Sequence, residues 1–236
     1  MAGRGERFRE QGFDIPKPLI EFEGKTMIEF AVETLGISGR FIFIVYKYDD
    51  CELNDRLRNI LNKISENPII IEIDYITEGP ADSALLAERF IYCEEELIVT
   101  NCDQIMSWDS EKFLRFSKSS NLDGIVVTYN SDVTKNSYIR LDKDGFGELL
   151  AEKKVISNLS LNGIHYWKKG KYFIDSAKMM IEKNIRVNNE FYISMTYNEM
   201  IDSGMKVGNY HIDNSEHHAV GTPEDLKKYL VKNGNN

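Results

Sequence analysis

The sequence has little cysteine, little proline and no long apolar run. Its 236 residues include three cysteines, five prolines and two tryptophans. The number of cysteines is odd and no two of them have the CxxC spacing, so we expect reduced thiols as in cytoplasmic proteins. No apolar run approaches the roughly 20 residues that cross a bilayer. The sequence therefore predicts a soluble, cytoplasmic protein with no membrane partner.

A surplus of positive charge is also missing. Lys and Arg together number 29 against 38 for Asp and Glu, which gives a formal net charge of −9. This balance argues against nucleic acid or an anionic membrane as the main partner, although a local basic pocket can still lie within an acidic shell. The chain is long enough for one α/β domain, and no linker-like stretch divides it. We therefore expect a single domain over residues 1–236.

Apolar runs of strand length alternate with segments of helical periodicity. In the first part we expect strands at residues 41–46, 68–73, 96–100 and 124–129, and helices at 27–35, 52–64 and 83–90. Later we expect a hairpin of 137–141 and 147–152, a strand at 161–167, and helices at 173–183, 193–202 and 223–232. This alternation predicts an α/β fold with a mixed, mainly parallel sheet and ligand-binding loops at the carboxyl ends of its strands.

The first seventeen residues carry a pattern suited to phosphate. Gly3 and Gly5 let backbone N–H groups face an anion, because neither residue has a Cβ atom. Arg7 and Lys17 add a planar, bidentate cation and a mobile point charge, the combination that a triphosphate requires. Taken alone, a short glycine loop often marks only a tight turn.

Arg7-Phe8, Pro16-Lys17-Pro18-Leu19 and Gly24-Lys25-x-Met27-Ile28 follow the glycine loop in order. Together the segment resembles the signature of the nucleotidyltransferase family, the sugar-1-phosphate nucleotidylyltransferases or pyrophosphorylases. The resemblance implies a Rossmann-like, three-layer α/β/α sandwich of the nucleotidyltransferase (GT-A-like) type. It also implies that Arg7 and Lys17 are catalytic, and that four loop residues bind the nucleotide: Ala2, Gly3, Arg4 and Gly5.

Two further segments resemble the nucleotide side of this family. Thr77, Gly79 and Ser83 lie in a stretch similar to the second glycine loop, which contacts the base; the alternative is a strand-to-helix turn with Asp82 or Ser83 as N-cap. Asn101 and Asp103 follow an apolar strand, where the family has a nucleotide contact and the aspartate that holds catalytic Mg²⁺. The alternative for Asp103 is a structural hydrogen bond to its own loop.

The acceptor side is matched within residues 136–236, which we expect to form the acceptor-binding half, with residues 1–135 as the nucleotide-binding half. Glu152-Lys153, Asn162-Gly163 and Glu190 resemble the segments in which the family contacts the sugar and its phosphate. Lys154 stands where the family has proline, so the choice between Lys153 and Lys154 stays open. The plain alternatives are a solvated charge pair at a hairpin end and a helix-capping segment before residue 193.

The last match is the hexapeptide from Gly221 to Leu226, where Thr222 suits an N-cap and Pro223 the first helical position. Many relatives have an aspartate as a second metal ligand two residues before the glycine, but this chain has Ala219. His217 and His218 lie just upstream, and in a strand only one of the two would face the site. Asp103 is therefore the one metal ligand that the sequence predicts.

The resemblance implies transfer of a nucleoside monophosphate from a nucleoside triphosphate to a sugar 1-phosphate or similar phosphorylated acceptor, with release of pyrophosphate and with Mg²⁺ as cofactor. The product would feed surface polysaccharide synthesis. One alternative is a GT-A glycosyltransferase, which consumes a nucleotide sugar; another is a degenerate nucleotide-binding module, which Ala219 favours. The base, the acceptor and a homo-oligomeric state stay open.

In the implied fold, a strand in the middle of the sheet leads into the glycine loop, and Met1 occupies the last position of that strand. Loss of the strand would expose the hydrogen-bonding edges of its two neighbours. We therefore expect the first strand to be truncated here, and the natural reading frame to begin several residues earlier with a short apolar run.

Overall fold

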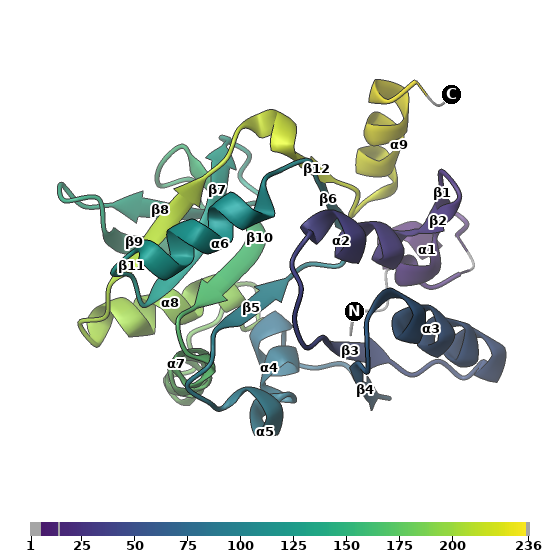
Figure 1. Ribbon diagram of the computed structural model, residues 1–236, viewed down its shortest axis with the longest axis horizontal. Helices are drawn as coiled ribbons and strands as arrows, with labels where there is room; N and C mark the ends of the chain where they lie inside the picture. Colours follow the sequence, from purple (N-terminus) through teal and green to yellow (C-terminus); the bar gives the residue numbers. More distant parts are fainter. Residues whose placement is uncertain (1–5, 14, 235–236) are drawn as a thin grey trace. The chain divides into compact units, whose positions relative to one another are not determined.

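The computed structural model describes residues 6–13 and 15–234, and its chain divides into two compact units (Figure 1). Unit 1 comprises the described residues of Met1–Ile76, Asn101–Ser110 and Ser215–Asn236, and unit 2 comprises Thr77–Thr100 and Glu111–Asn214. The glycine loop and the expected end of a first strand at Met1 lie outside the described residues. The division of the chain near residue 135 stays a prediction.

The first half of unit 1 is a parallel strand pair covered by two helices. Strands β3 (Ile42–Tyr46) and β4 (Ile69–Ile73) pair in parallel, and helices α2 (Met27–Leu35) and α3 (Cys51–Ile64) supply the apolar side chains that bury them. Helix α2 begins with a capping box, in which Thr26 and Glu29 satisfy each other's backbone N–H groups. All four elements lie where the sequence predicts them, to within one or two residues.

The rest of unit 1 is built from short pieces. A hairpin joins β1 (Glu21–Phe22) to β2 (Lys25–Thr26), and β6 (Gln104–Met106) pairs antiparallel with β12 (His217–Ala219). Helices α1 (Glu6–Arg9) and α9 (Pro223–Lys232), with the 3₁₀ turns η1 (Lys17–Leu19) and η2 (Asn214–Glu216), complete the series. A second core holds these pieces together, with Phe8, Ile20, Ile105, Val220 and Leu226 buried within it.

Unit 2 contains a six-stranded mixed sheet, in which β10 (Leu159–Trp167) pairs antiparallel with three neighbours. The neighbours are β5 (Leu97–Thr100), β7 (Gly124–Asn130) and β8 (Ser137–Leu141). Strand β9 (Gly147–Glu152) is the second arm of the expected hairpin. Strand β11 (Val207–His211) pairs in parallel with β7, and among the described residues this is the only parallel pairing of the sheet. The expectation of a mainly parallel sheet is therefore wrong for the described residues. The long strand β10 and the hairpin of β8 and β9 reverse the chain direction in the later half.

Helices cover both faces of the unit 2 sheet (Figure 1). On one face, Phe113 of α6 (Ser110–Ser119) packs edge-on against Tyr166 and against Tyr210. On the other face, Trp167 stacks on Tyr197 of α8 (Ile193–Asp202), next to α7 (Gly170–Glu182). Residues 166 and 167 alternate sides because successive side chains of a strand point to opposite faces. Unit 2 thus has the expected helix–sheet–helix layers.

One expected helix is broken. The segment 83–90 forms two short helices, α4 (Pro80–Leu85) and α5 (Glu88–Ile91). The amides of Leu86 and Ala87 bond to carbonyls three residues back, which is the tighter 3₁₀ pattern that ends the first helix. None of the helices in the described part of the chain is long and apolar enough to cross a membrane.

Candidate active site

Lys17 and Asp103, two of the predicted site residues of unit 1, form an ion pair. Pro16 leads into the turn η1, which Lys17 begins, and Asp103 lies in the short link before β6. The Lys17 ammonium donates to Asp103 Oδ2 at 2.5 Å, and both side chains are only partly accessible, at 20% and 26%. The Lys17 Nζ atom also lies 5.8 Å from the centre of the Phe8 ring, so that α1 adjoins the pair.

Gly221 leaves the space that this pair needs. The amide of Val220 donates to the carbonyl of Asp103 at 3.0 Å, which holds the two loops together beside the β6–β12 pairing. A Cβ atom on Gly221 would lie 2.6 Å from Asp103 Oδ2 and 3.5 Å from Lys17 Nζ. The sequence explains Gly221 only as part of a helix start, and that part is confirmed, because Thr222 caps α9. Its role beside Asp103 could be seen only in the structure.

Two other predicted residues of unit 1, Arg7 and Asn101, are exposed. Arg7 lies on α1 with its side chain in solvent, and Asn101 is exposed two residues before Asp103. The four glycine-loop residues that the family resemblance assigns to the nucleotide lie outside the described residues: Ala2, Gly3, Arg4 and Gly5.

Asp103 supplies one hard oxygen donor of the type that Mg²⁺ prefers. In residues 6–13 and 15–234, no group of three or more His, Cys, Asp or Glu side chains is arranged to hold a metal ion. Magnesium is commonly held by one or two carboxylates together with substrate phosphates and water. These residues therefore fit an ion that binds together with a triphosphate, rather than one in a cage made by the protein alone.

Strand β12 contains Ala219, at the position where many relatives have a second metal ligand. Ala219 pairs with Gln104 across the β6–β12 ladder, so a methyl group stands at that position. Burial, followed by the neighbouring His218, lowers the pKa of His217 to about 4, although Asp103 and Asp225 raise it. The His217 ring is therefore neutral at pH 7.

In unit 2, the Gly79 loop is tied together by its own side chains. The hydroxyls of Thr77 and Ser83 lie 2.5 Å apart, and Asp82 accepts a hydrogen bond from the Glu78 amide at 2.9 Å. Helix α4 begins at Pro80 with Gly79 as N-cap, so the alternative in which Asp82 or Ser83 is the N-cap is wrong.

The backbone of this loop lies directly against the segment that carries Glu190. Phe191 donates to the carbonyl of Glu78 at 2.8 Å and accepts from the Ala81 amide at 3.0 Å. Gly79 has a φ of +133°, and a Cβ atom there would lie 2.5 Å from the Phe191 nitrogen. Two predicted site segments, more than 100 residues apart in sequence, are thus neighbours.

Glu152 and Lys153 lie at the end of β9 in a second polar cluster. Burial raises the pKa of Glu152, while hydrogen bonds from Ser137 and Ser194 oppose that shift. The Lys153 ammonium donates to the Tyr192 hydroxyl, and that hydroxyl donates to Glu190. Lys154 is exposed, so Lys153 is the lysine of this cluster. The sequence predicts Glu152, Lys153 and Glu190, but gives no signal for Tyr192.

Asn162 and Gly163 lie inside β10, where the pairing with β7 shifts register between Leu161 and His165. Asn162 is buried and accepts the Ile164 amide at 2.9 Å. Gly163 has a φ of +94°, a backbone conformation that favours glycine. Asn162 and Gly163 therefore lie at a break in the strand register in the middle of the sheet.

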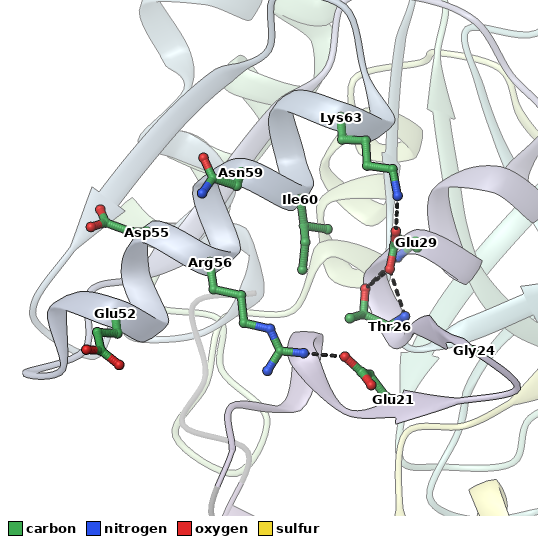
Figure 2. A pocket seen from close by; sticks show the side chains of 10 residues that line it. All are labelled: Glu21, Gly24, Thr26, Glu29, Glu52, Asp55, Arg56, Asn59, Ile60 and Lys63. Atoms are coloured by element: carbon green, nitrogen blue, oxygen red, sulfur yellow. Dashed lines mark hydrogen bonds and ion pairs between the residues drawn. The ribbon is translucent and has the colours of Figure 1, made fainter.

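A separate cavity of about 620 Å³ opens between α3 and the β1–β2 hairpin of unit 1. Figure 2 shows Arg56 reaching Glu21 and Lys63 reaching Glu29 across it. Its lining contains none of the predicted site residues. The predicted site residues Lys17 and Asp103, with Gly221 beside them, do not line this cavity.

The profile of the nucleotidyl transferase family matches residues 1–233. The chain belongs to that family. The family match spans both units, so the Lys17–Asp103 pair of unit 1 and the Glu152 cluster of unit 2 are parts of one nucleotidyl transferase chain.

Curated relatives of this nucleotidyl transferase include a "Bifunctional protein GlmU" of Methanocaldococcus jannaschii. It is 26% identical over 238 residues, which cover 98% of this chain and 53% of the relative. A "Mannose-1-phosphate guanyltransferase" of Yarrowia lipolytica is 27% identical over 160 residues, covering 66% and 44%. This nucleotidyl transferase chain thus spans about half the length of these relatives.

Among solved structures, a nucleoside-diphosphate-sugar pyrophosphorylase from Vibrio cholerae RC9 matches this nucleotidyl transferase with a TM-score of 0.82. The match has 20% identity and covers 98% of both chains. At this level of identity the likeness concerns the fold. It agrees with the α/β architecture seen here.

Proposed function

We propose that this nucleotidyl transferase moves a nucleoside monophosphate from a nucleoside triphosphate onto a sugar 1-phosphate and releases pyrophosphate. The observation that carries the proposal is the Lys17–Asp103 pair, a cation and an oxygen ligand 2.5 Å apart beside Gly221. A site that joins two polyanions needs such a cation and a carboxylate for a divalent metal ion. The relatives, which include a mannose-1-phosphate guanyltransferase, support the same class of reaction.

The chemistry asks for electrostatics rather than for a general base. A phosphate oxygen of the acceptor attacks the α-phosphorus, the new P–O bond forms, and pyrophosphate leaves with the electron pair of the broken bond. The attacking oxygen is already an anion, so the main barrier comes from bringing two anions together. Lys17 reduces that repulsion at the α-phosphate, and Arg7 with the amides around Gly3 and Gly5 binds the outer phosphates.

Asp103 would hold Mg²⁺ in this scheme. When bound, the ion would neutralise charge on the phosphate oxygens. In the structure, the Lys17 ammonium already engages one oxygen of Asp103. The lysine therefore holds the carboxylate in place until the metal–triphosphate complex arrives.

In the proposed scheme, unit 2 provides recognition of the base and of the acceptor. Thr77, Gly79 and Ser83 contact the base, and Asn101 of unit 1 contributes to nucleotide binding.

Four residues recognise hydroxyl groups of the sugar: Glu152, Asn162, Gly163 and Glu190. Lys153 binds the acceptor phosphate. Carboxylates suit sugar hydroxyls because a hydroxyl donates its hydrogen to a charged acceptor, which gives a strong hydrogen bond. The product would enter surface polysaccharide synthesis in the cytoplasm.

The test is a pyrophosphate-release assay with the full chain and Mg²⁺. Each of ATP, GTP, CTP, UTP and dTTP is combined with a panel of sugar 1-phosphates. We expect pyrophosphate and a nucleotide sugar from one combination or a few.

The same assay separates the two other candidates. Consumption of a nucleotide sugar with release of a free nucleotide, and no pyrophosphate, would show a glycosyltransferase instead. Triphosphate binding without turnover across the panel would show a degenerate binding module, the candidate that Ala219 favours.

A further inference from the structure

Three polar side chains of unit 2 form a continuous chain of hydrogen bonds. The Lys153 ammonium donates to the Tyr192 hydroxyl, and the hydroxyl donates its own hydrogen to Glu190. A phenol can accept and donate at the same time, so one oxygen satisfies both neighbours. Lys153 and Glu190 both act on the charge of Glu152, the first lowering its pKa and the second raising it.

The Tyr192 ring makes a second contact with the same lysine. The Lys153 Nζ atom lies 4.6 Å from the ring centre, within the range of a cation–π interaction. Lysine has a long and flexible side chain, and fixing it costs conformational entropy. The ring and the hydroxyl of Tyr192 restrict the Lys153 side chain before any substrate binds, so less conformational entropy is lost on binding.

Hydrogen bonds hold the backbone at Lys153 and next to Tyr192. Lys153 adopts a φ of +55°, and its amide donates to the Asn136 carbonyl at 2.9 Å. Tyr192 is the N-cap residue of α8, and it follows Phe191, which is 1% exposed and hydrogen-bonded on both sides to the Gly79 loop. The Tyr192 side chain therefore projects from hydrogen-bonded backbone, and its hydroxyl contacts both Lys153 and Glu190.

We propose that Tyr192 is a positioning residue that pre-organises Lys153 and Glu190 for the phosphorylated acceptor, an inference that rests on the function proposed above. Its hydroxyl sets the ammonium where the acceptor phosphate binds and sets the carboxylate where a sugar hydroxyl binds. It also keeps the two charges from closing into a direct ion pair, which would occupy the groups that the acceptor needs. Tyr192 therefore acts on acceptor binding and leaves triphosphate binding unchanged.

The test is Tyr192→Phe, which removes the hydroxyl and keeps the ring over Lys153. With the nucleotide and sugar 1-phosphate found in the pyrophosphate assay, we expect KM for the sugar phosphate to rise about tenfold, a loss of about 1.4 kcal/mol. KM for the triphosphate and the melting temperature stay at their wild-type values. Tyr172→Phe is the matched control, because that ring also lies beside a lysine, with Lys169 Nζ at 5.7 Å. We expect Tyr172→Phe to leave KM for the sugar phosphate and KM for the triphosphate unchanged.

A double-mutant cycle separates positioning from a purely structural role. If Tyr192 acts through Lys153, then Tyr192→Phe adds little to the loss in a Lys153→Met background. An unchanged acceptor KM in Tyr192→Phe, or fully additive losses in the cycle, would overturn the proposal. Failure of the proposed function is seen separately, as a wild-type chain that releases no pyrophosphate with any pair of substrates, and the inference about Tyr192 then falls with it.

Discussion

At the scale of single residues, Lys17 and Asp103 depend on each other. Each side chain is about three-quarters or more shielded from solvent, and each neutralises the charge of the other at 2.5 Å. Because both side chains are only partly buried, a ligand can still reach them. A pair in this state can exchange one partner for a phosphate or a metal ion, which a fully buried pair could do only at high cost.

Replacing Lys17 tests its proposed role. We expect Lys17→Ala to lower kcat of pyrophosphate release by about 10² to 10³, the range for loss of one stabilising donor at a reacting centre. The melting temperature should change little, because water can reach the Asp103 carboxylate. Steady-state kinetics and thermal unfolding measure the two effects. Lys178→Ala is the matched control, since Lys178 pairs with Glu88 at 2.6 Å in unit 2. An unchanged kcat in Lys17→Ala would remove Lys17 from the mechanism.

Gly221 gives a second prediction at this scale. In Gly221→Ala the new Cβ atom would meet Asp103 Oδ2 at 2.6 Å, so the carboxylate must move away. We expect a several-fold higher Mg²⁺ concentration for half-maximal activity, with the fold retained. Gly39→Ala is the control, because a Cβ atom there would meet nothing within 4 Å. Equal Mg²⁺ dependence in both variants would show that Gly221 does not control the Asp103 carboxylate.

His165 connects a buried side chain to the pH dependence of stability. Burial lowers its pKa to about 3 from an ordinary value of 6.5, and its Nδ1 atom has no hydrogen-bond partner among the described residues. Between these values the unfolded chain binds a proton that the folded chain does not, so stability is complete above pH 6.5 and falls as the pH drops. At pH 5 the loss is about 2 kcal/mol.

The variant His165→Phe removes this contribution. We expect its free energy of unfolding to depend less on pH than that of the wild type between pH 6.5 and 5. Urea unfolding at pH 8, 6.5 and 5 measures the difference. Equal slopes for the two proteins would mean that the His165 ring is protonated in the folded state.

At the scale of elements, α7 and α8 are joined by a buried charge. Glu199 on α8 is 1% exposed, and Lys183, at the C-cap of α7, donates to it at 2.6 Å. Helix packing alone would not require a carboxylate here. The ion pair thus links the end of α7 to a buried position of α8.

Removing the exposed partner should destabilise the protein. Lys183→Met leaves the Glu199 carboxylate buried without its cation, so we expect a lower melting temperature in differential scanning fluorimetry. Lys178→Met is the matched control, since its partner Glu88 is 42% exposed and can be solvated. Adding Glu199→Leu to Lys183→Met should restore much of the loss. If Lys183→Met melts like the control, the pair contributes nothing to the packing of the two helices.

The elements also show where local sequence is informative. The hairpin of β8 and β9 lies at the predicted bounds, because Asp142 accepts the amides of Asp144 and Phe146 and Gly145 has a φ of +85°. These are interactions within a few residues. Strands β6 and β12 were not predicted, because each has three residues and gains its partner from a segment more than 100 residues away.

At the scale of the whole molecule, the proposed function requires an acidic chain to bind acidic substrates. A net charge of −9 repels a triphosphate at long range, so the proposed binding would depend on the local cations and on Mg²⁺. We expect the matching nucleoside triphosphate with Mg²⁺ to raise the melting temperature. A ligand concentration of about 100 times the dissociation constant adds about 2.7 kcal/mol to the free energy of unfolding.

Thermal shift with the five triphosphates tests this, and EDTA should remove the effect. Lys17→Ala should weaken the shift and Lys178→Ala should not. If none of the triphosphates shifts the wild-type chain, the protein does not bind them as proposed.

The sequence alone determined the family and most helices and strands, and it predicted Lys17 and Asp103 as site residues, because signatures, caps and apolar periodicity are local properties. Only the tertiary structure decided that most strand pairs of the unit 2 sheet are antiparallel, that Gly221 makes room beside Asp103, and that Tyr192 joins Lys153 to Glu190. Each of these depends on segments distant in the chain that come together when the apolar core is buried. Their distances follow from packing, which no short stretch of sequence contains.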